Sequence, residues 1–213
     1  MKIGIIQASS QKDKNELIFE CAKKAIDENT NTVVNFGIFK DEDVSYSYVE
    51  TAIQISLLLE SGAIDFVISG CSSGQGMMLA CNSLPGILCG YIENPSDAYL
   101  FGRINDGNVV SLPLGLNFGW AAEINLQSTL DQLFCEPFGT GYPAKDAARK
   151  QKDTKLLKEI NALTKRNIID VLPQLDKSLI QKVLQRDVVF DYIMKYGTNP
   201  RLQTMLKELR DEK

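Results

Sequence analysis

The fold of this chain is decided by the stretch Ile68-Ser69-Gly70-Cys71-Ser72-Ser73-Gly74-Gln75-Gly76, where a β-rich run passes through a turn of serine and glycine into a helical run. In an open parallel sheet such a turn lies at the carboxyl ends of the strands, where ligands bind. The backbone N–H groups of Ser72 to Gly76 would lie at a helix N-terminus, which attracts negative charge. The stretch therefore predicts a site for an oxyanion or a phosphate, with the thiol of Cys71 beside it.

Short β-rich runs alternate with helical stretches as far as about residue 134, which is typical of a parallel sheet covered on both faces. We predict strands at residues 2–7, 32–36, 66–69, 87–91 and 108–112, and helices at 14–28, 46–60, 74–83, 95–104 and 118–134. Right-handed crossovers would join them into an α/β fold, a Rossmann-like three-layer sandwich with a five-stranded parallel sheet.

The pattern changes after the glycine- and proline-containing stretch Phe138-Gly139-Thr140-Gly141-Tyr142-Pro143. Residues 145–213 are rich in Lys, Leu, Gln, Arg and Asp, and their apolar residues recur at helical spacing. We therefore predict an α/β domain over residues 1–144 and a helical extension over residues 145–213, with Asn199-Pro200 opening the last helix.

Composition excludes several classes of protein. The chain has 213 residues and no histidine, and its net charge of −4 argues against a broad nucleic-acid-binding face. Its five cysteines form no C-x-x-C pair, so we expect reduced thiols and no metal site. Without a long apolar run we expect a cytoplasmic protein with neither a membrane nor a nucleic-acid partner.

Acid/base chemistry in a chain without histidine must use thiols, carboxylates, hydroxyls or amines, which makes Cys71 the first candidate for a catalytic base. The positive end of the following helix would stabilise its thiolate form. The N–H groups of the turn would then hold the enediolate that forms when a proton is removed beside a carbonyl. The competing interpretation is that Cys71 is a small buried hydrophobe and that the glycines only shape a tight turn.

Two longer blocks surround these residues. The first is Gly70-Cys71-Ser72-Ser73-Gly74-Gln75-Gly76 followed by Met77-Met78-Leu79-Ala80-Cys81-Asn82-Ser83-Leu84-Pro85-Gly86. The second consists of Glu93-Asn94-Pro95-Ser96-Asp97-Ala98 and Asn105-Asp106-Gly107-Asn108-Val109-Val110. They resemble the ribose-5-phosphate isomerase B and galactose-6-phosphate isomerase family, which carries C-G-T-G-x-G with A-A-N-K-x-P-G, and S-E-P-Y-S-A with H-N-D-x-N-V-L.

The resemblance covers about residues 1–150 and implies an aldose–ketose isomerase that moves a proton between C1 and C2 without a metal or an organic cofactor. It implies that Cys71 is the base, because the other branch of the family uses a glutamate where Met77 stands. It also implies a homodimer or a dimer of dimers with shared active sites. By the same resemblance the site contains Tyr48, Ser72, Ser73, Gly74, Gln75, Gly76 and Asn105.

The chain departs from the family pattern in the groups for ring opening and phosphate binding. The family's Asp-His after the first strand is replaced by Gln7-Ala8-Ser9-Ser10, and its ring-opening histidine corresponds to Ile104. The arginine after the fifth strand has no counterpart in Leu112-Pro113-Leu114-Gly115-Leu116-Asn117. A substrate already in open-chain form would not need ring opening. The candidate replacements are Ser9, Ser10, Tyr48 and Asp106 for proton transfer, and Lys12, Lys14, Arg149 and Lys150 for phosphate.

We therefore expect an aldose–ketose isomerase of a small, phosphorylated sugar or a related one, with Cys71 taking the C2 proton. One alternative is a sugar-phosphate-binding protein that has lost catalysis. A nucleotide-binding Rossmann domain fits less well, because the first strand leads into Gln-Ala-Ser-Ser instead of G-x-G-x-x-G.

Overall fold

A five-stranded parallel sheet forms the centre of the computed structural model, which describes residues 1–27, 29–116 and 118–212. The strand order is β2-β1-β3-β5-β4, which confirms the predicted α/β class and five-stranded parallel sheet. The strands are β1 (Lys2–Ile5), β2 (Thr32–Asn35), β3 (Phe66–Cys71), β4 (Cys89–Tyr91) and β5 (Val109–Pro113). Every residue of the central strand β3 is buried, as expected for a strand covered on both faces.

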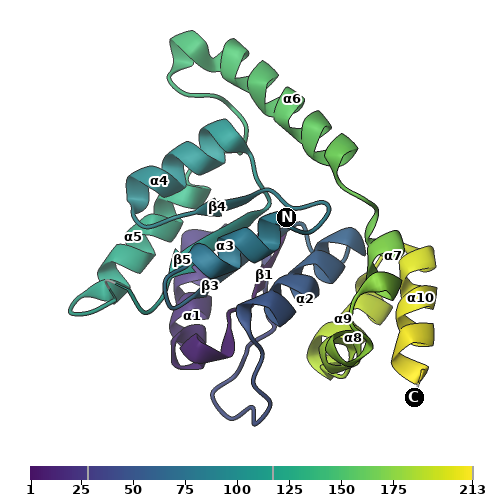
Figure 1. Cartoon of the computed structure of the whole chain (residues 1–213). Coiled ribbons are helices and arrows are strands. Elements are labelled where there is room, and N and C mark those ends of the chain that lie inside the picture. The colour runs from purple at the N-terminus through teal and green to yellow at the C-terminus, as the bar shows by residue number, and fades with distance from the viewer. Residues whose placement is uncertain (28, 117, 213) are drawn as a thin grey trace.

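Helices cover both faces of the sheet and give it three layers (Figure 1). The helices α1 (Asn15–Ala25), α4 (Pro95–Leu100) and α5 (Ala122–Phe134) share one apolar cluster with one face. The helices α2 (Tyr48–Glu60) and α3 (Gln75–Asn82) share a second cluster with the other face. The chain crosses from β3 to α3 at the carboxyl edge of the sheet, as the sequence predicts.

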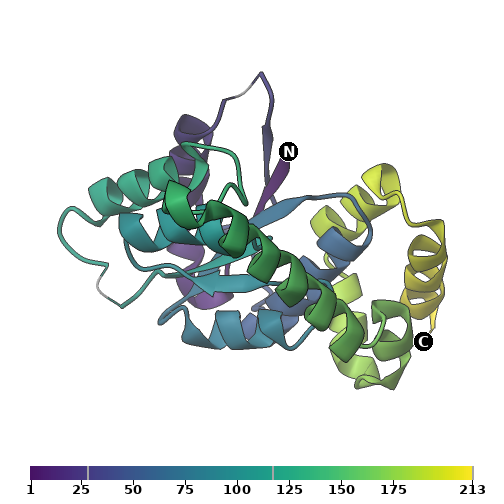
Figure 2. The same cartoon turned by 90° about the horizontal axis from the view of Figure 1, so that it is seen from above.

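The C-terminal third of the chain is helical and has two parts. Helix α6 (Ala147–Thr164) crosses over the amino-terminal edge of the sheet, where Thr154 and Asn161 donate to the carbonyl oxygens of Ile104 and Ile87, whereas the following helices gather beside α2 (Figures 1 and 2). These are α7 (Ile168–Val171), α8 (Lys177–Leu184), α9 (Asp187–Tyr196) and α10 (Pro200–Asp211). Their buried residues, such as Ile180, Ile193 and Leu206, belong to the same apolar cluster as Leu57 and Leu58 of α2. The division of the chain at residue 144 stays a prediction.

Several predicted boundaries differ from the observed ones. β3 continues to Cys71 because its pairing with β5 continues until Cys71 lies opposite Pro113. The predicted helix 95–104 is α4 followed by a π-helical turn, η2 (Phe101–Asn105), which ends where Asp106 adopts a left-handed conformation. The predicted end of the first helix at residue 28, and residues 117 and 213, lie outside the described residues.

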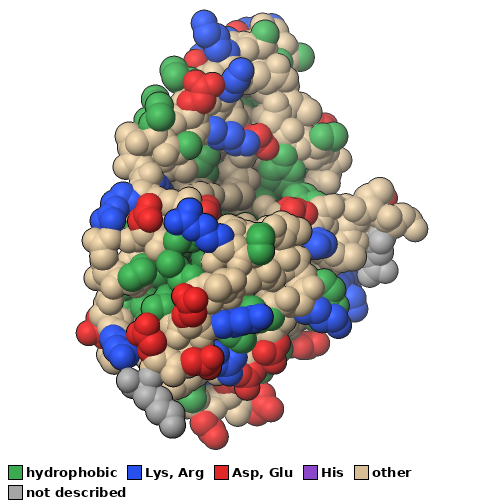
Figure 3. Space-filling view, turned by 90° about the vertical axis from the view of Figure 1, so that its right-hand side faces the viewer, with side chains coloured by type: hydrophobic (Ala, Val, Ile, Leu, Met, Phe, Trp, Pro, Cys, Tyr) green, Lys and Arg blue, Asp and Glu red, His purple; other side chains and the backbone are tan. Residues whose placement is uncertain are grey.

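The surface around the C-terminal helices carries positive and negative side chains side by side (Figure 3). Among the described residues, no helix has both the length and the apolar content needed to cross a membrane. The cytoplasmic location stays a prediction.

Candidate active site

The turn between β3 and α3 is shaped by Gly74, which caps α3 in the left-handed conformation with φ +74°. The hydroxyl of Ser111 donates a hydrogen bond of 2.6 Å to the carbonyl oxygen of Gly74. A Cβ at this position would lie 2.7 Å from a ring carbon of Tyr91 and 3.1 Å from the backbone of Leu112 and Pro113. Only glycine fits this backbone, which points the N–H groups of the first turn of α3 out of the sheet edge.

Cys71 is the last residue of β3 and lies directly before this turn. Its side chain is 7% exposed and packs in the apolar cluster that also contains Met77 and Cys81. The backbone N–H of Leu114 donates to the Cys71 carbonyl at 3.0 Å, which fixes the strand end. The thiol is therefore largely buried, as the competing interpretation expects, and Cys71 stands at the carboxyl edge of the sheet, where ligands of such sheets bind.

Polar side chains from the loop after β1, whose second part is a 3₁₀ helix, η1 (Ser9–Lys14), meet the turn. The side-chain amide of Gln11 donates to the Ser72 hydroxyl at 2.9 Å, and the Ser72 hydroxyl donates to that of Ser10 at 3.3 Å. The hydroxyl of Ser9 accepts a 2.7 Å hydrogen bond from the backbone N–H of Tyr46. These contacts place the loop after β1 beside the turn, as the substrate-binding prediction for Ser9 and Ser10 requires.

The ring of Tyr48 lies against Gly76, since a Cβ on Gly76 would be 3.4 Å from two of its carbons. Tyr48 is 44% exposed, so its ring forms an open wall of the site. The turn itself contributes the rest of this half of the site. The predicted residues that gather at this edge are Ser9, Ser10, Tyr48, Cys71, Ser72, Ser73, Gly74, Gln75 and Gly76.

Sequence reasoning missed Gln11 and Tyr91. Tyr91 ends β4, packs on Gly74 and has a side-chain hydrogen bond with Gln75. Burial raises the pKa of the Tyr91 hydroxyl, and the carboxylates of Glu93 and Asp97 raise it further. The signal for Tyr91 was available, because it is the last residue of a predicted strand and strand ends meet at one edge of a parallel sheet.

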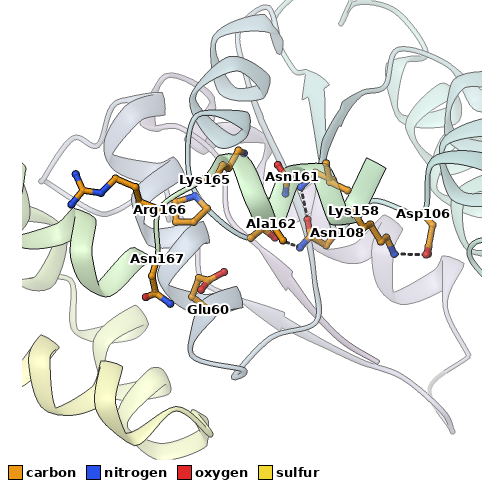
Figure 4. A pocket seen from close by; sticks show the side chains of 12 residues that line it. Glu60, Asp106, Asn108, Lys158, Asn161, Ala162, Lys165, Arg166 and Asn167 are labelled. Carbon is orange, nitrogen blue, oxygen red and sulfur yellow. Dashed lines mark hydrogen bonds and ion pairs between the residues drawn. The ribbon is translucent and has the colours of Figure 1, made fainter. Parts of the chain in front are cut away.

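The predicted residues Asn105 and Asp106 lie at the opposite, amino-terminal edge of the sheet, just before β5. From Val109 to Pro113, β5 spans about 13 Å, which separates them from the turn. Asp106 forms an ion pair with Lys158 of α6 and lines a cavity of about 530 Å³ under that helix (Figure 4). Asn105 lines a different cavity of about 410 Å³, whose lining also includes Tyr91.

The predicted phosphate-binding cations are not gathered at the turn either. Arg149 pairs with Asp153 on α6 at 3.1 Å, and Lys150 lies on the same helix. Lys12 donates to the Glu42 carbonyl oxygen at 3.0 Å, and Lys14 pairs with Asp13 at 2.5 Å. One chain therefore supplies the thiol, the hydroxyls and the N–H groups of the site. No contact between these four cations and residues 71–76 is observed in the described part of the chain.

A sequence comparison now assigns the family. The model of the ribose/galactose isomerase family matches residues 3–132, which contain the sheet from Ile3 onwards, the turn and Tyr91. The chain belongs to the ribose/galactose isomerase family. Membership confirms the suspected resemblance and makes this protein a member of a sugar isomerase family.

Two solved structures resemble this family member over its whole length. A 4-deoxy-L-threo-5-hexosulose-uronate ketol-isomerase, crystallised in complex with a tartrate, is 38% identical, with a TM-score of 0.94 and coverage of 100% of both chains. A ribose-5-phosphate isomerase of Vibrio parahaemolyticus is 32% identical, with a TM-score of 0.92, and covers 98% of this chain and 99% of its own.

A smaller relative shares only the fold. The type B ribose 5-phosphate isomerase of Trypanosoma brucei is 22% identical with a TM-score of 0.61. The match covers 97% of that protein but 74% of this chain. About a quarter of this isomerase family member therefore has no counterpart there, whereas both full-length relatives match the C-terminal helices as well.

Proposed function

We propose that this protein is a cofactor-free aldose–ketose isomerase in which Cys71 is the base. The Cys71 thiolate removes the proton from C2 of the aldose, the electron pair of that C–H bond forms the C1–C2 double bond, and the π pair of the C1 carbonyl moves onto O1. The proton of the C2 hydroxyl passes to O1, so that the charge of the enediolate rests on O2. The protonated thiol then returns its proton to C1, and the pair on O2 forms the ketone at C2. The single observation that carries this proposal is the position of Cys71 at the end of β3, directly before the N–H groups of α3.

The N–H groups of the turn would stabilise the negative charge that develops on the substrate oxygen. Removing one such donor in other enzymes costs about 10²–10³-fold in rate. Gln11, Ser72 and Ser10 form a neutral hydrogen-bonded row beside the turn, which suits the hydroxyls of a sugar. Tyr48 and Tyr91 stand on either side, against Gly76 and Gly74, and would limit access of water.

The substrate class that fits best is an open-chain keto sugar acid. This chain contains no histidine, and Ile104 and the Gln7–Ser10 stretch offer no strong acid or base for ring opening. The substrate in the name of the 38% identical relative is a 4-deoxy-5-hexosulose uronate. It lacks the C4 hydroxyl and has a ketone in place of the C5 hydroxyl, the two groups that normally close an aldose ring. An enzyme for such a substrate needs a C2 base but no ring-opening histidine.

The acidic group of such a substrate is a carboxylate instead of a phosphate. The relative was solved with a tartrate, which is also a hydroxy carboxylate. A single negative charge makes a smaller demand on cations than a phosphate dianion, in keeping with the neutral contacts around Ser72. A phosphorylated pentose is the second candidate, favoured by the 32% identical ribose-5-phosphate isomerase of Vibrio parahaemolyticus.

We also propose that two copies of the chain share their active sites. Asn105, Asp106, Arg149 and Lys150 lie on the amino-terminal edge or on α6, so they reach a turn only if it belongs to a second copy. Helix α6 supports this arrangement because it exposes an apolar stripe to solvent. The stripe consists of Leu156, Leu157, Ile160 and Leu163, which are 53%, 43%, 48% and 85% exposed. Such a stripe on a helix is a typical subunit contact.

The test is C1–C2 proton exchange in deuterated water with 4-deoxy-L-threo-5-hexosulose uronate, ribose 5-phosphate and galactose 6-phosphate. Cys71→Ala is expected to lower kcat at least about 100-fold with little change in fold, because a positioned base contributes about 10²–10⁴-fold. Cys21→Ala is the matched control, since Cys21 is also buried, at 4% exposure, but lies on α1.

A Cys71→Ala variant with the wild-type rate would show that another group is the base. Thermal stabilisation by a sugar of this panel without exchange at C2 would instead identify the protein as a non-catalytic binder.

A further inference from the structure

The loop that joins β2 to α2, residues 36–47, contains neither a strand nor a helix and leads directly to Tyr48 of the candidate site. On one side it is bound to the loop after β1. The N–H of Ser9 donates to the carbonyl of Tyr46 at 3.0 Å, and the Gln7 side chain donates to the Ile38 carbonyl at 2.8 Å. Its other side is held by a residue from the C-terminal helices.

That residue is Arg186, which lies between α8 and α9 and is 4% exposed. Its guanidinium binds both carboxylate oxygens of Glu42, at 3.0 Å from Nε and 2.7 Å from Nη2. It also donates to the Phe36 carbonyl, at the start of the loop, and its Cζ lies 5.5 Å from the centre of the Tyr46 ring. One buried side chain therefore contacts the beginning, middle and end of the loop.

Glu42, which Arg186 binds, also accepts hydrogen bonds from two other residues. Its carboxylate accepts the N–H of Phe39 at 2.7 Å, while its carbonyl accepts the Lys12 ammonium at 3.0 Å. Lys182 of α8 adds a second link, since it pairs with Glu50 at 2.7 Å and lies 5.4 Å from the Tyr46 ring centre. Two cations of the extension thus lie close to the same aromatic ring.

The 36–47 loop is also connected to the turn between β3 and α3. Tyr46 binds Ser9 by two hydrogen bonds, and the neighbouring Ser10 accepts from Ser72. Directly after the loop, Tyr48 rests on Gly76. Displacement of the loop would therefore move both the hydroxyl row and the Tyr48 wall.

We propose that Arg186 is a positioning residue, through which the C-terminal helices hold the 36–47 loop in the shape that the substrate site requires. Arg186 contacts no predicted site residue itself, so it acts through Glu42 and Tyr46. The family match ends at residue 132, before these helices begin. The expected effect of Arg186 on turnover rests on the proposed function. Its effect on the 36–47 loop can be measured by itself.

The experiment compares Arg186→Met with Arg210→Met in the full-length chain. Arg210 is a matched control because it also belongs to the C-terminal helices, where it pairs with the exposed Asp187 and lies 4.1 Å from the Phe190 ring centre. Hydrogen exchange of the backbone, followed by mass spectrometry, is expected to quicken in residues 37–48 and 9–12 of Arg186→Met. Those segments should exchange as in wild type in Arg210→Met.

Turnover is measured on 4-deoxy-L-threo-5-hexosulose uronate and ribose 5-phosphate. Arg186→Met should lower kcat/KM by about tenfold or more, mainly through KM, because small displacements of positioning groups have such effects. Arg210→Met should stay within about twofold, since exposed ion pairs contribute little. Arg186→Lys keeps the charge without the two-pronged contact and should recover only part of the loss.

Glu42→Gln tests the same contact if Arg186→Met fails to fold, and the double variant should be no worse than Arg186→Met alone. Unchanged exchange in residues 37–48, or a loss of kcat/KM equal to that of Arg210→Met, overturns the proposal. If the wild type turns over neither substrate, the proposed function fails, and the exchange data still decide whether Arg186 holds the loop.

Discussion

Replacing Gly74 by alanine tests whether the shape of the turn between β3 and α3 depends on this one residue. The new Cβ would lie 2.7 Å from a Tyr91 ring carbon and 3.1 Å from the backbone of Leu112 and Pro113. The left-handed conformation costs a non-glycine residue roughly 1–2 kcal/mol, and overpacking adds about 1–3 kcal/mol. Alanine also reduces the conformational entropy of the unfolded chain, which offsets about 0.4–1 kcal/mol of this cost. We expect Gly74→Ala to lower the free energy of unfolding by about 2–4 kcal/mol.

Gly76→Ala is the matched control, two residues along the same chain. Gly76 lies in the first turn of α3, and its Cβ would make an ordinary contact of 3.4 Å with the Tyr48 ring. Alanine is favoured over glycine in a helix by up to about 1 kcal/mol, so this variant should be as stable as wild type or slightly more stable. Both replacements add one methyl group, and only the backbone conformation and the neighbours differ.

The assay is equilibrium unfolding in urea, with all variants at one protein concentration because an oligomer's stability depends on it. With a slope of about 2–3 kcal/mol per molar, Gly74→Ala should unfold at a midpoint roughly 1 M lower than wild type. Equal midpoints for the two variants would falsify the account of the turn, because the left-handed backbone would then carry no cost for a side chain.

Two further perturbations test the surroundings of the site. Burial raises the pKa of Glu60 above its ordinary value of 4.5, so the folded state binds this proton more tightly than the unfolded state does. The protonated carboxyl therefore stabilises the fold relative to the ionised one, and this stability is lost as the pH rises through the raised pKa. Glu60→Gln should therefore raise the melting temperature at about pH 7 and change it little at about pH 3.5; a shift of equal size at both values would rule out this explanation. Ile160→Lys with Leu163→Lys on the exposed stripe of α6 should shift the protein to monomers in sedimentation velocity, whereas Lys152→Gln on the same helix should not. A double variant that sediments as wild type would mean that this stripe is not the subunit contact.

All five strands of the sheet could be predicted, because most of them are short runs rich in β-branched and apolar residues that alternate with helical stretches. The structure places Cys71 directly before the turn that leads into α3, but Cys71 belongs to β3, because the pairing of β3 with β5 continues two residues beyond the predicted strand end at residue 69. The sequence signalled Tyr91 only as the end of a predicted strand and gave no signal for Gln11. Their roles depend on contacts with Gly74, Gln75 and Ser72, which lie far away in the sequence.

The sequence by itself determined the α/β class, the position of the glycine turn and the absence of histidine, since each is a property of local residues or of composition. Only the tertiary structure decided which predicted site residues meet. Asn105 and Asp106 precede β5, whereas Cys71 lies opposite Pro113 at the far end of the same strand. The length of β5 therefore places Asn105 and Asp106 at the edge of the sheet opposite Cys71. The link from Arg186 to the loop around Glu42 joins residues 144 positions apart, and only the packing of the C-terminal helices on α2 could reveal it.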